Sequence, residues 1–205
     1  MQVNNIFCVG RNYKLHAKEL GNEVPPKPMI FGKPTNALTV TDNQIIPMPK
    51  GKGEIHYEVE LVIHINKSYE TGMKAADCVD QIAVGIDFTM RDVQNELKKK
   101  GHPWLLAKGF VNSAVVTPFF PIIIEQLNDC SFGLKINGQT VQHGDPKDMI
   151  FSFDTIVQYI AENFGLCSGD IIFTGTPAGV GAISNGDLFE LYFSGEKKGS
   201  FTIEL

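Results

Sequence analysis

The sequence predicts a mixed α+β fold that is dominated by β-strands and carries a few short helices. Residues 55–65 alternate between apolar and other side chains, which is the two-residue period of a strand. Asn137-Gly138 stands between two short apolar segments and indicates a tight hairpin. Strands and helices do not alternate regularly along the chain, so a parallel doubly wound sheet is not expected.

Length and composition indicate one globular domain over residues 1–205. A chain of 205 residues with 43% hydrophobic side chains can bury one sizeable core, and no linker divides it. The net charge of -5 argues against a nucleic-acid partner, and the basic run at residues 98–100 is expected to be a solvated helix end. No run approaches the roughly 20 apolar residues of a membrane span, and no signal peptide is recognisable, so we expect a cytoplasmic protein without a membrane partner.

The four cysteines give no sign of a zinc site or a redox pair. They are widely spaced and form no Cys-x-x-Cys motif, so we expect buried thiols at Cys8, Cys78, Cys130 and Cys167.

In the first half of the chain, capping and breaking residues set the expected element ends. Asn12 is expected to cap a helix that runs to about residue 20, and Gly101 with Pro103 to end a helix over residues 91–100. We also expect an extended segment at residues 29–31, a strand at 55–65, a short helix at 74–79 and a buried strand at 82–87.

In the second half, apolar periodicity defines one long helix and the closing strands. The pattern over residues 154–164 is amphipathic, and its buried face should contain Ile156, Val157, Ile160 and Phe164. The Asn137-Gly138 hairpin follows the strand pattern described above. A short strand is expected at residues 170–174, before a glycine-rich loop. Residues 188–193 and 201–205 are expected to form a final hairpin.

The strand over residues 55–65 carries two acidic neighbours on one face. Its odd positions form an apolar wall, while Glu58 and Glu60 share the other face with no Lys or Arg between them. A bound cation would turn their repulsion into coordination, and carboxylates favour Mg²⁺, Mn²⁺ or Ca²⁺. The alternative for this segment alone is a half-exposed strand with one face in water. His56 and His64 share the acidic face, and we expect packed or solvated side chains there, not ligands.

Asp87 supplies a third carboxylate at the end of an apolar strand. Its side chain should emerge where a sheet ends, although an isolated Asp in this position could simply start a turn. Together with Glu58 and Glu60, it resembles a three-carboxylate Mg²⁺ site that leaves positions open for water or substrate.

Three further residues are candidates for catalysis. His16 and Glu19 lie three apart on the first expected helix and therefore share a face. If that face covers the ion, the pair can take a proton from water; the alternative is an exposed helix surface. Lys108 lies in an apolar stretch, where it could stabilise an enolate or extend its ammonium group to solvent.

The loop over residues 174–181 superficially resembles a phosphate loop. It lacks the Gly-Lys-Ser/Thr ending and a following helix, so nucleotide binding is not expected. Its backbone amides and threonine hydroxyls could receive a substrate carboxylate, or the segment could be a plain turn.

Five motifs occur in a fixed order along the chain: Cys8-Val-Gly-Arg-Asn12-Tyr-x-x-His16-x-x-Glu19, His56-Tyr-Glu58-Val-Glu60-Leu, Asp87-Phe-Thr-x-Arg91-Asp92-x-Gln94, Lys98-Lys-Lys-Gly-x-Pro-Trp104-x-x-Ala-Lys108, and Thr174-Gly-Thr-Pro-x-Gly-Val-Gly181. Together they resemble the fumarylacetoacetate hydrolase (FAH) family, particularly its short acylpyruvases and oxaloacetate decarboxylases. The match covers nearly the whole chain. It implies the FAH-type mixed β-roll with peripheral short helices, usually as a homodimer.

The resemblance also assigns roles to the candidate residues. It implies Mg²⁺ or Mn²⁺ at Glu58, Glu60 and Asp87, while the carboxylate ligands by themselves would also suit Ca²⁺. It places His16 and Glu19 on a mobile lid helix as the water-activating pair and makes Lys108 the enolate-stabilising residue. The residues expected near the substrate are Arg91, Gln94, Lys33 and Thr176.

The implied activity is cleavage of the C–C bond of acylpyruvates (2,4-dioxo acids) through a metal-bound pyruvate enolate. Oxaloacetate decarboxylation and 2-oxo acid isomerisation or tautomerisation stay open, because each would use the same site on a small 2-oxo acid. Full-length fumarylacetoacetases carry a fourth acidic ligand where this chain has Arg11 and Asn12, so their own substrate is not implied. A noncatalytic Ca²⁺-stabilised metabolite-binding module is an alternative of another class, against which the intact His16, Glu19 and Lys108 argue.

Overall fold

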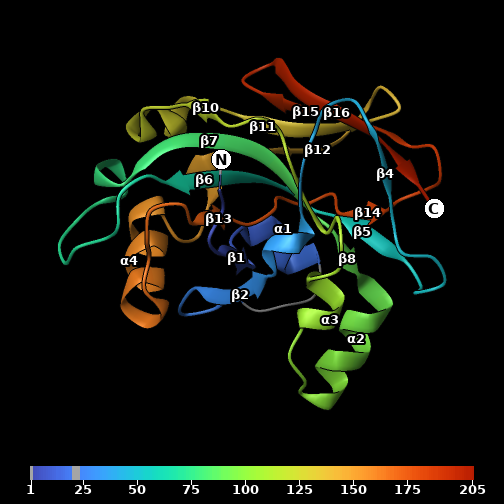
Figure 1. Ribbon diagram of the computed structural model, residues 1–205, viewed down its shortest axis with the longest axis horizontal. Helices are drawn as coiled ribbons and strands as arrows, with labels where there is room; N and C mark the ends of the chain where they lie inside the picture. Colours follow the sequence, from blue (N-terminus) through green and yellow to red (C-terminus); the bar gives the residue numbers. More distant parts are fainter. Residues whose placement is uncertain (1, 20–23) are drawn as a thin grey trace.

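Strands dominate the computed structural model, which describes residues 2–19 and 24–205, and they form three sheets (Figure 1). The expected mixed α+β class is confirmed. None of the described helices is both long and apolar enough to cross a membrane.

The largest sheet contains the strands that carry the acidic residues. Its order is β2-β1-β13-β6-β7-β9-β3, and β10 pairs with β7. In the antiparallel β6–β7 pair, Val59 lies opposite Ile86 and Glu60 opposite Gly85, so the acidic end of β6 lies beside the end of β7. The strands are β1 Ile6–Gly10, β2 Met29–Lys33, β3 Leu38–Val40, β6 Val59–Ile65, β7 Val79–Asp87, β9 Ala114–Val116, β10 Phe120–Pro121 and β13 Ile171–Phe173.

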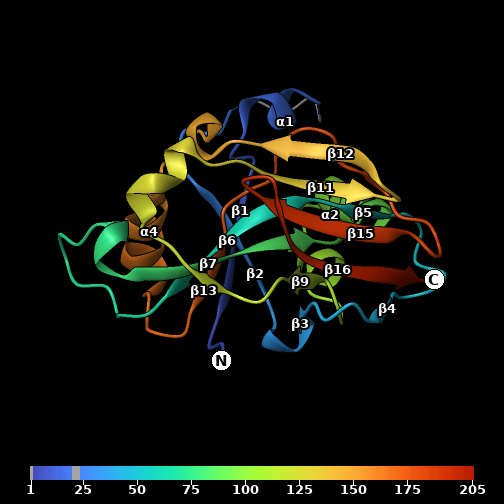
Figure 2. The same ribbon diagram turned by 90° about the horizontal axis from the view of Figure 1, so that it is seen from above.

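Two smaller sheets complete the β structure. The five-stranded sheet has the order β12-β11-β15-β16-β4, which Figure 2 shows in one layer, and the third has the order β14-β5-β8. The expected hairpin is confirmed, since Asn137 and Gly138 turn the chain with left-handed φ values of 51° and 80°. The closing hairpin is longer than expected, because β16 begins at Glu196. The strands are β4 Ile45–Pro47, β5 Ile55–Tyr57, β8 Thr89–Met90, β11 Phe132–Ile136, β12 Gln139–Gly144, β14 Gly181–Ala182, β15 Leu188–Phe193 and β16 Glu196–Glu204.

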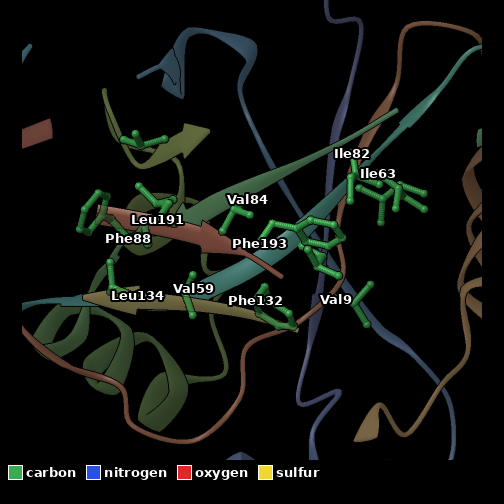
Figure 3. Close-up of a cluster of buried hydrophobic side chains, with 14 of the residues drawn as sticks. Val9, Val59, Ile63, Ile82, Val84, Phe88, Phe132, Leu134, Leu191 and Phe193 are labelled. Atoms are coloured by element: carbon green, nitrogen blue, oxygen red, sulfur yellow. The ribbon is translucent and has the colours of Figure 1, made fainter. Parts of the chain in front are cut away.

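The main core lies between the β6–β7 strands and the five-stranded sheet. Val59 and Val84 of the large sheet meet Leu134 and Leu191 of the other, and all four are fully buried (Figure 3). The opposite face of β6 is also buried, because Val62 packs in a second apolar cluster. The alternative of a strand with one wet face is therefore wrong.

The expected continuous strand over residues 55–65 is interrupted at Glu58, between β5 and β6. The amide of Val59 donates to the side-chain oxygen of Gln142 at 2.8 Å, so a side chain from β12 takes part at the break. This interruption lies at the first of the acidic residues.

The four described helices are α1 Lys14–Glu19, α2 Arg91–Lys100, α3 Leu105–Lys108 and α4 Phe153–Phe164. Helix α2 occupies its expected range and ends at Gly101, where φ is 66°. Helix α4 begins one residue early, because Ser152 caps it by accepting a hydrogen bond from Thr155 N at 3.3 Å. The expected burial of Phe164 is wrong: the residue is 58% exposed at the end of α4, with its ring centroid 6.0 Å from that of Phe7.

Asn12 does not cap α1. Its amide donates to the carbonyl of Thr174 and its side-chain oxygen accepts from the amide of Phe151, each at 2.8 Å. The buried side chain thus connects three segments that lie far apart in the sequence. Residue 20, where this helix was expected to end, lies outside the described residues.

Two smaller expectations also need correction. Residues 74–79 form only a short 3₁₀ turn, because the side chain of Asp77 accepts from Lys74 N at 2.7 Å and closes the segment locally. Of the four thiols, Cys130 is half-buried and Cys167 exposed, so only the other two are buried. The 3₁₀ turns are η1 Thr35–Ala37, η2 Ala75–Asp77, η3 Ile124–Asp129 and η4 Pro146–Asp148.

Gly85 offers a test of the packing around β7. A Cβ at this position would lie 2.8 Å from Val62 Cγ2 and 2.9 Å from the ring of Phe173. We expect Gly85→Ala to lower the free energy of unfolding by about 1–3 kcal/mol through overpacking, measured by urea denaturation. Gly32→Ala in β2 is the control, since its new Cβ meets one atom, Ile6 O, at 3.4 Å. Equal losses in both variants would contradict the packing explanation.

Candidate active site

The three predicted acidic ligands come together in the structure. Glu58 lies between β5 and β6, Glu60 lies on β6, and Asp87 ends β7. The amide of Asp87 donates to the carbonyl of Glu58 at 2.9 Å, which fixes the two chain segments side by side. Each carboxylate offers an oxygen that lies within 4.8 Å of the others, and the residues are only 6%, 2% and 0% exposed.

The chemistry of this acidic trio, Glu58, Glu60 and Asp87, fits a hard divalent cation. Burial raises the pKa of Glu60 well above its usual value, and the neighbouring charges of Asp87 and Glu58 raise it further. A bound cation would relieve this crowding of like charges, and all-oxygen donors suit Mg²⁺ or Mn²⁺. Glu60 accepts a hydrogen bond from Gly175 N at 2.6 Å, which orients one of its oxygens.

Lys108 is buried within the trio and does not extend to solvent. Its ammonium group lies 2.8 Å from Glu58 Oε2 and 2.6 Å from Asp87 Oδ2. Burial lowers the pKa of Lys108, but Asp87 and Glu58 outweigh it and hold the pKa above its usual value. The lysine therefore stays charged, and an ion bound by the same oxygens would compete with it for them.

Two more cations neutralise the trio. Arg91 Nη2 lies 2.6 Å from Glu58 Oε1, while Nη1 donates to Gln94 Oε1 at 2.6 Å. Burial raises the pKa of Glu58, yet Lys108 and Arg91 outweigh it and hold that pKa well below its usual range. Lys33 lies 2.8 Å from Asp87 Oδ1 as an ion pair without hydrogen-bond geometry, and it also donates to backbone carbonyls.

The four residues expected near the substrate do not all lie at the same place. Arg91, Gln94 and Thr176 line the cavity beside the acidic trio. Lys33 is not among the residues that line it, because its ammonium group is engaged with Asp87 and with the carbonyls of Phe88 and Lys108. The structure thus makes Lys33 a support for Asp87.

Helix α1 places His16 against the same cavity. His16 is 4% exposed, and its Nδ1 atom lies 3.4 Å from Glu19 Oε2. Burial lowers the pKa of His16, so the imidazole is neutral at pH 7 and can accept a proton. Glu19 also accepts from the amide of Gly179 at 3.2 Å.

Two backbone amides of the glycine-rich loop donate hydrogen bonds to acidic side chains of the protein itself. Gly175 N donates to Glu60 and Gly179 N donates to Glu19. Those two amides are therefore engaged, and the expected role in receiving a substrate carboxylate applies to neither of them. The loop instead connects the acidic trio with helix α1.

Both histidines that were set aside as ligands lie in other contacts. His56 Nε2 lies 3.0 Å from Glu54, and His64 Nδ1 lies 2.7 Å from Asp80. This placement agrees with their exclusion.

Sequence reasoning missed Gln142, which is 1% exposed on β12. Its side-chain oxygen accepts from Val59 N, while its amide nitrogen donates to Thr176 Oγ1 and Pro177 O, each at 2.9 Å. One side chain thus supports both the acidic strand and the glycine-rich loop. A glutamine in an amphipathic hairpin carries no local signal of this role.

The cavity wall contains two cations that were not predicted as site residues, Arg11 and Lys98. Lys98 is not the solvated helix end expected: it is half-buried, with its ammonium 5.2 Å from the centroid of the Trp104 ring. The cavity has a volume of only about 30 Å³.

The fold and this site define a member of the fumarylacetoacetate hydrolase family. The family model described as "Fumarylacetoacetate (FAA) hydrolase C-terminal" matches residues 5–203. The chain belongs to this family, and the resemblance seen in its motifs is confirmed.

Curated relatives and solved structures agree with this assignment. The mitochondrial oxaloacetate tautomerase of Caenorhabditis elegans is 41% identical over 97% of this chain and 94% of its own length. The oxaloacetate tautomerase YcgM of Escherichia coli is 36% identical over 94% and 90%. The crystal structure of fumarylpyruvate hydrolase from Pseudomonas aeruginosa, in complex with Mn²⁺ and pyruvate, superposes with a TM-score of 0.90 at 34% identity and covers 99% of this chain and 90% of that one.

We expect each member of the acidic trio to be needed for ion binding. Glu58→Gln, Glu60→Gln and Asp87→Asn should each weaken Mn²⁺ or Mg²⁺ binding at least about tenfold, measured by isothermal titration calorimetry. Asp80→Asn is the matched control, because it lies on the same strand β7 but pairs with His64. Unchanged ion affinity in any of the three variants would remove that residue from the site.

Without added metal, two of these variants should differ in stability. Glu60→Gln removes a crowded acid and should stabilise the fold, whereas Glu58→Gln leaves Lys108 and Arg91 short of a partner and should destabilise it. Because folding raises the pKa of Glu60, the folded state binds its proton more tightly, and stability should fall as pH rises above the unfolded value of about 4.3. Glu60→Gln should reduce this decline. Thermal unfolding between about pH 4 and 8 measures both effects, and a stability loss in Glu60→Gln would contradict the assigned repulsion.

Proposed function

We propose that this chain is a divalent-cation-dependent enzyme that interconverts the enol and keto forms of oxaloacetate. The observation that carries the proposal is the buried ammonium of Lys108 between Glu58 and Asp87, in one cavity with the neutral His16. Support comes from the relatives named oxaloacetate tautomerases, which match at least 90% of both chains. The structural neighbour with Mn²⁺ and pyruvate supports a 2-oxo acid as the substrate class.

The trio would hold Mg²⁺ or Mn²⁺, which when bound would act as a Lewis acid that polarises the 2-oxo group. Charge develops on the enolate as a proton leaves O2 or C3, and Lys108 supplies a fixed positive charge beside it. Because the ammonium is buried beside the trio, it is already removed from water before that charge develops.

Tautomerisation also needs a group that moves a proton between O2 and C3. Glu58 and Asp87 hold the pKa of Lys108 above its usual value, so we assign it the stabilisation of charge and not the transfer of the proton. His16 is neutral and lines the cavity, and Glu19 can orient its imidazole through Nδ1. We assign the proton transfer to His16.

Acylpyruvate hydrolysis is the second candidate, and the His16–Glu19 pair favours it. In that reaction His16 takes a proton from water, the oxygen attacks C4, and the C3–C4 bond breaks. The acyl group leaves as a carboxylic acid, and C3 of the pyruvate enolate receives the proton. Lys108 would stabilise the same enolate, so one site serves both candidates.

The expected homodimer and the cytoplasmic location stay predictions. Light scattering of the purified protein tests the first, and cell fractionation tests the second.

A substrate panel tests the proposed function. We expect the purified protein with Mg²⁺ to accelerate ketonisation of enol-oxaloacetate more than it accelerates oxaloacetate decarboxylation or hydrolysis of acetylpyruvate and fumarylpyruvate. Ultraviolet absorbance follows the enol, and chelation with EDTA should abolish the activity. Faster hydrolysis of an acylpyruvate would select the second candidate, and no turnover on the whole panel would reject both.

Lys108→Met tests the role of the buried ammonium. Loss of this charge should lower kcat for ketonisation by about 10²- to 10³-fold. Mn²⁺ affinity should be retained or increased, because the ammonium no longer competes for Glu58 and Asp87. The exposed Lys99→Met, which removes a lysine that pairs with Glu96, is the control. A variant that binds Mn²⁺ and keeps wild-type kcat would contradict the role.

A further inference from the structure

The basic residues around the cavity fall into two groups. Lys33, Arg91 and Lys108 are each paired with Glu58 or Asp87. Arg11 and Lys98 also line the cavity. In the described part of the chain, residues 2–19 and 24–205, neither of them forms an ion pair. Three cations thus pair with two acids of the trio, Glu58 and Asp87, and two further cations lie on the same wall.

Lys98 is held in the last turn of α2. Its ammonium lies 5.2 Å from the centroid of the Trp104 ring, and Trp104 lines the same cavity. Burial lowers the pKa of Lys98, and the neighbouring charges of Arg91 and Arg11 lower it further. All three cations line one cavity, and an anion bound there would relieve their mutual repulsion.

Arg11 is held in a conformation that ordinary residues avoid. Its φ of 57° is left-handed, which costs a non-glycine residue about 1–2 kcal/mol. The hydrogen bonds of the adjacent Asn12 to Thr174 and Phe151 fix the backbone at this point. Strain of this kind persists where the surroundings impose it and is typical of functional sites.

We propose that Arg11 and Lys98 form a subsite for a second carboxylate, so that the enzyme prefers small 2-oxo dicarboxylic acids to their monocarboxylic counterparts. The inference rests on the proposed function for the 2-oxo acid end of the ligand, which belongs with the acidic trio. A guanidinium group binds a carboxylate through paired hydrogen bonds, and an ammonium group adds a compact point charge. A divalent ion at the trio would make the cavity still more positive, which favours a dianion over a monoanion.

The subsite also gives the proposed substrate a fixed orientation. A ligand held at both ends has its C2 and C3 atoms between the trio and the Arg11–Lys98 pair. His16 and Lys108 line the same cavity, so O2 and C3, which exchange the proton, would share it with the groups assigned to them.

L-malate and L-lactate form a matched pair of probes for this subsite. They share the 2-hydroxy acid end and differ by the second carboxylate, and neither can enolise. In the presence of Mg²⁺, we expect the wild-type protein to bind malate at least about tenfold more tightly than lactate in isothermal titration calorimetry. Arg11→Asn and Lys98→Met should each weaken malate binding by about tenfold and leave lactate binding unchanged.

The variants are chosen to separate charge from folding. Asn tolerates left-handed φ, so Arg11→Asn removes the guanidinium without adding strain. Lys98→Arg keeps the charge and should keep the preference for malate, while Lys99→Met on the exposed side of α2 should change neither affinity. Thermal unfolding of each variant confirms that it is folded.

The outcomes distinguish this inference from the proposed function. Equal affinity of the wild-type protein for malate and lactate would overturn the subsite, as would equal losses for both ligands in Arg11→Asn and Lys98→Met. A preference for malate that depends on both residues supports the subsite even if oxaloacetate is not turned over, in which case the proposed reaction alone is rejected.

Discussion

The structure depends on the burial of three carboxylates within a few ångströms of one another. Water would stabilise such charges, but Glu58, Glu60 and Asp87 are almost inaccessible to it. Isolated buried charges are strongly unfavourable, so the surrounding chain must supply cations and hydrogen-bond donors. Lys33, Arg91, Lys108 and the Gly175 amide come from four different parts of the sequence to do so, which explains why elements distant along the chain converge here.

The chemistry of the site was largely predictable, because it follows from local patterns. Alternation in residues 55–65 placed Glu58 and Glu60 together, and the apolar strand before Asp87 placed that acid at a strand end. Both inferences need only the two-residue period of a strand and the end of an apolar run. The burial of the opposite face of β6 was not predictable from period alone, because it depends on which sheet packs there.

The parts that were missed depend on contacts across long stretches of sequence. Asn12 has the residue type of a helix cap, but it bonds with Phe151 and Thr174 instead, which only the folded arrangement brings near. Gln142 reaches Val59, 83 positions away, at the break in the acidic strand. In the sequence, Lys98 looks like part of an exposed basic run. It lines the cavity only because the turn after α2 brings Trp104 against it.

The short span between Gly175 and Gly179 connects the acidic trio with helix α1. One end of the span donates to Glu60 in the acidic trio, and the other end donates to Glu19 on helix α1. The same short backbone thus contacts Glu60 and Glu19, and Glu19 in turn lies beside His16. If ion binding and the packing of helix α1 are coupled through this span, thermodynamic reciprocity requires each to change the other by the same factor.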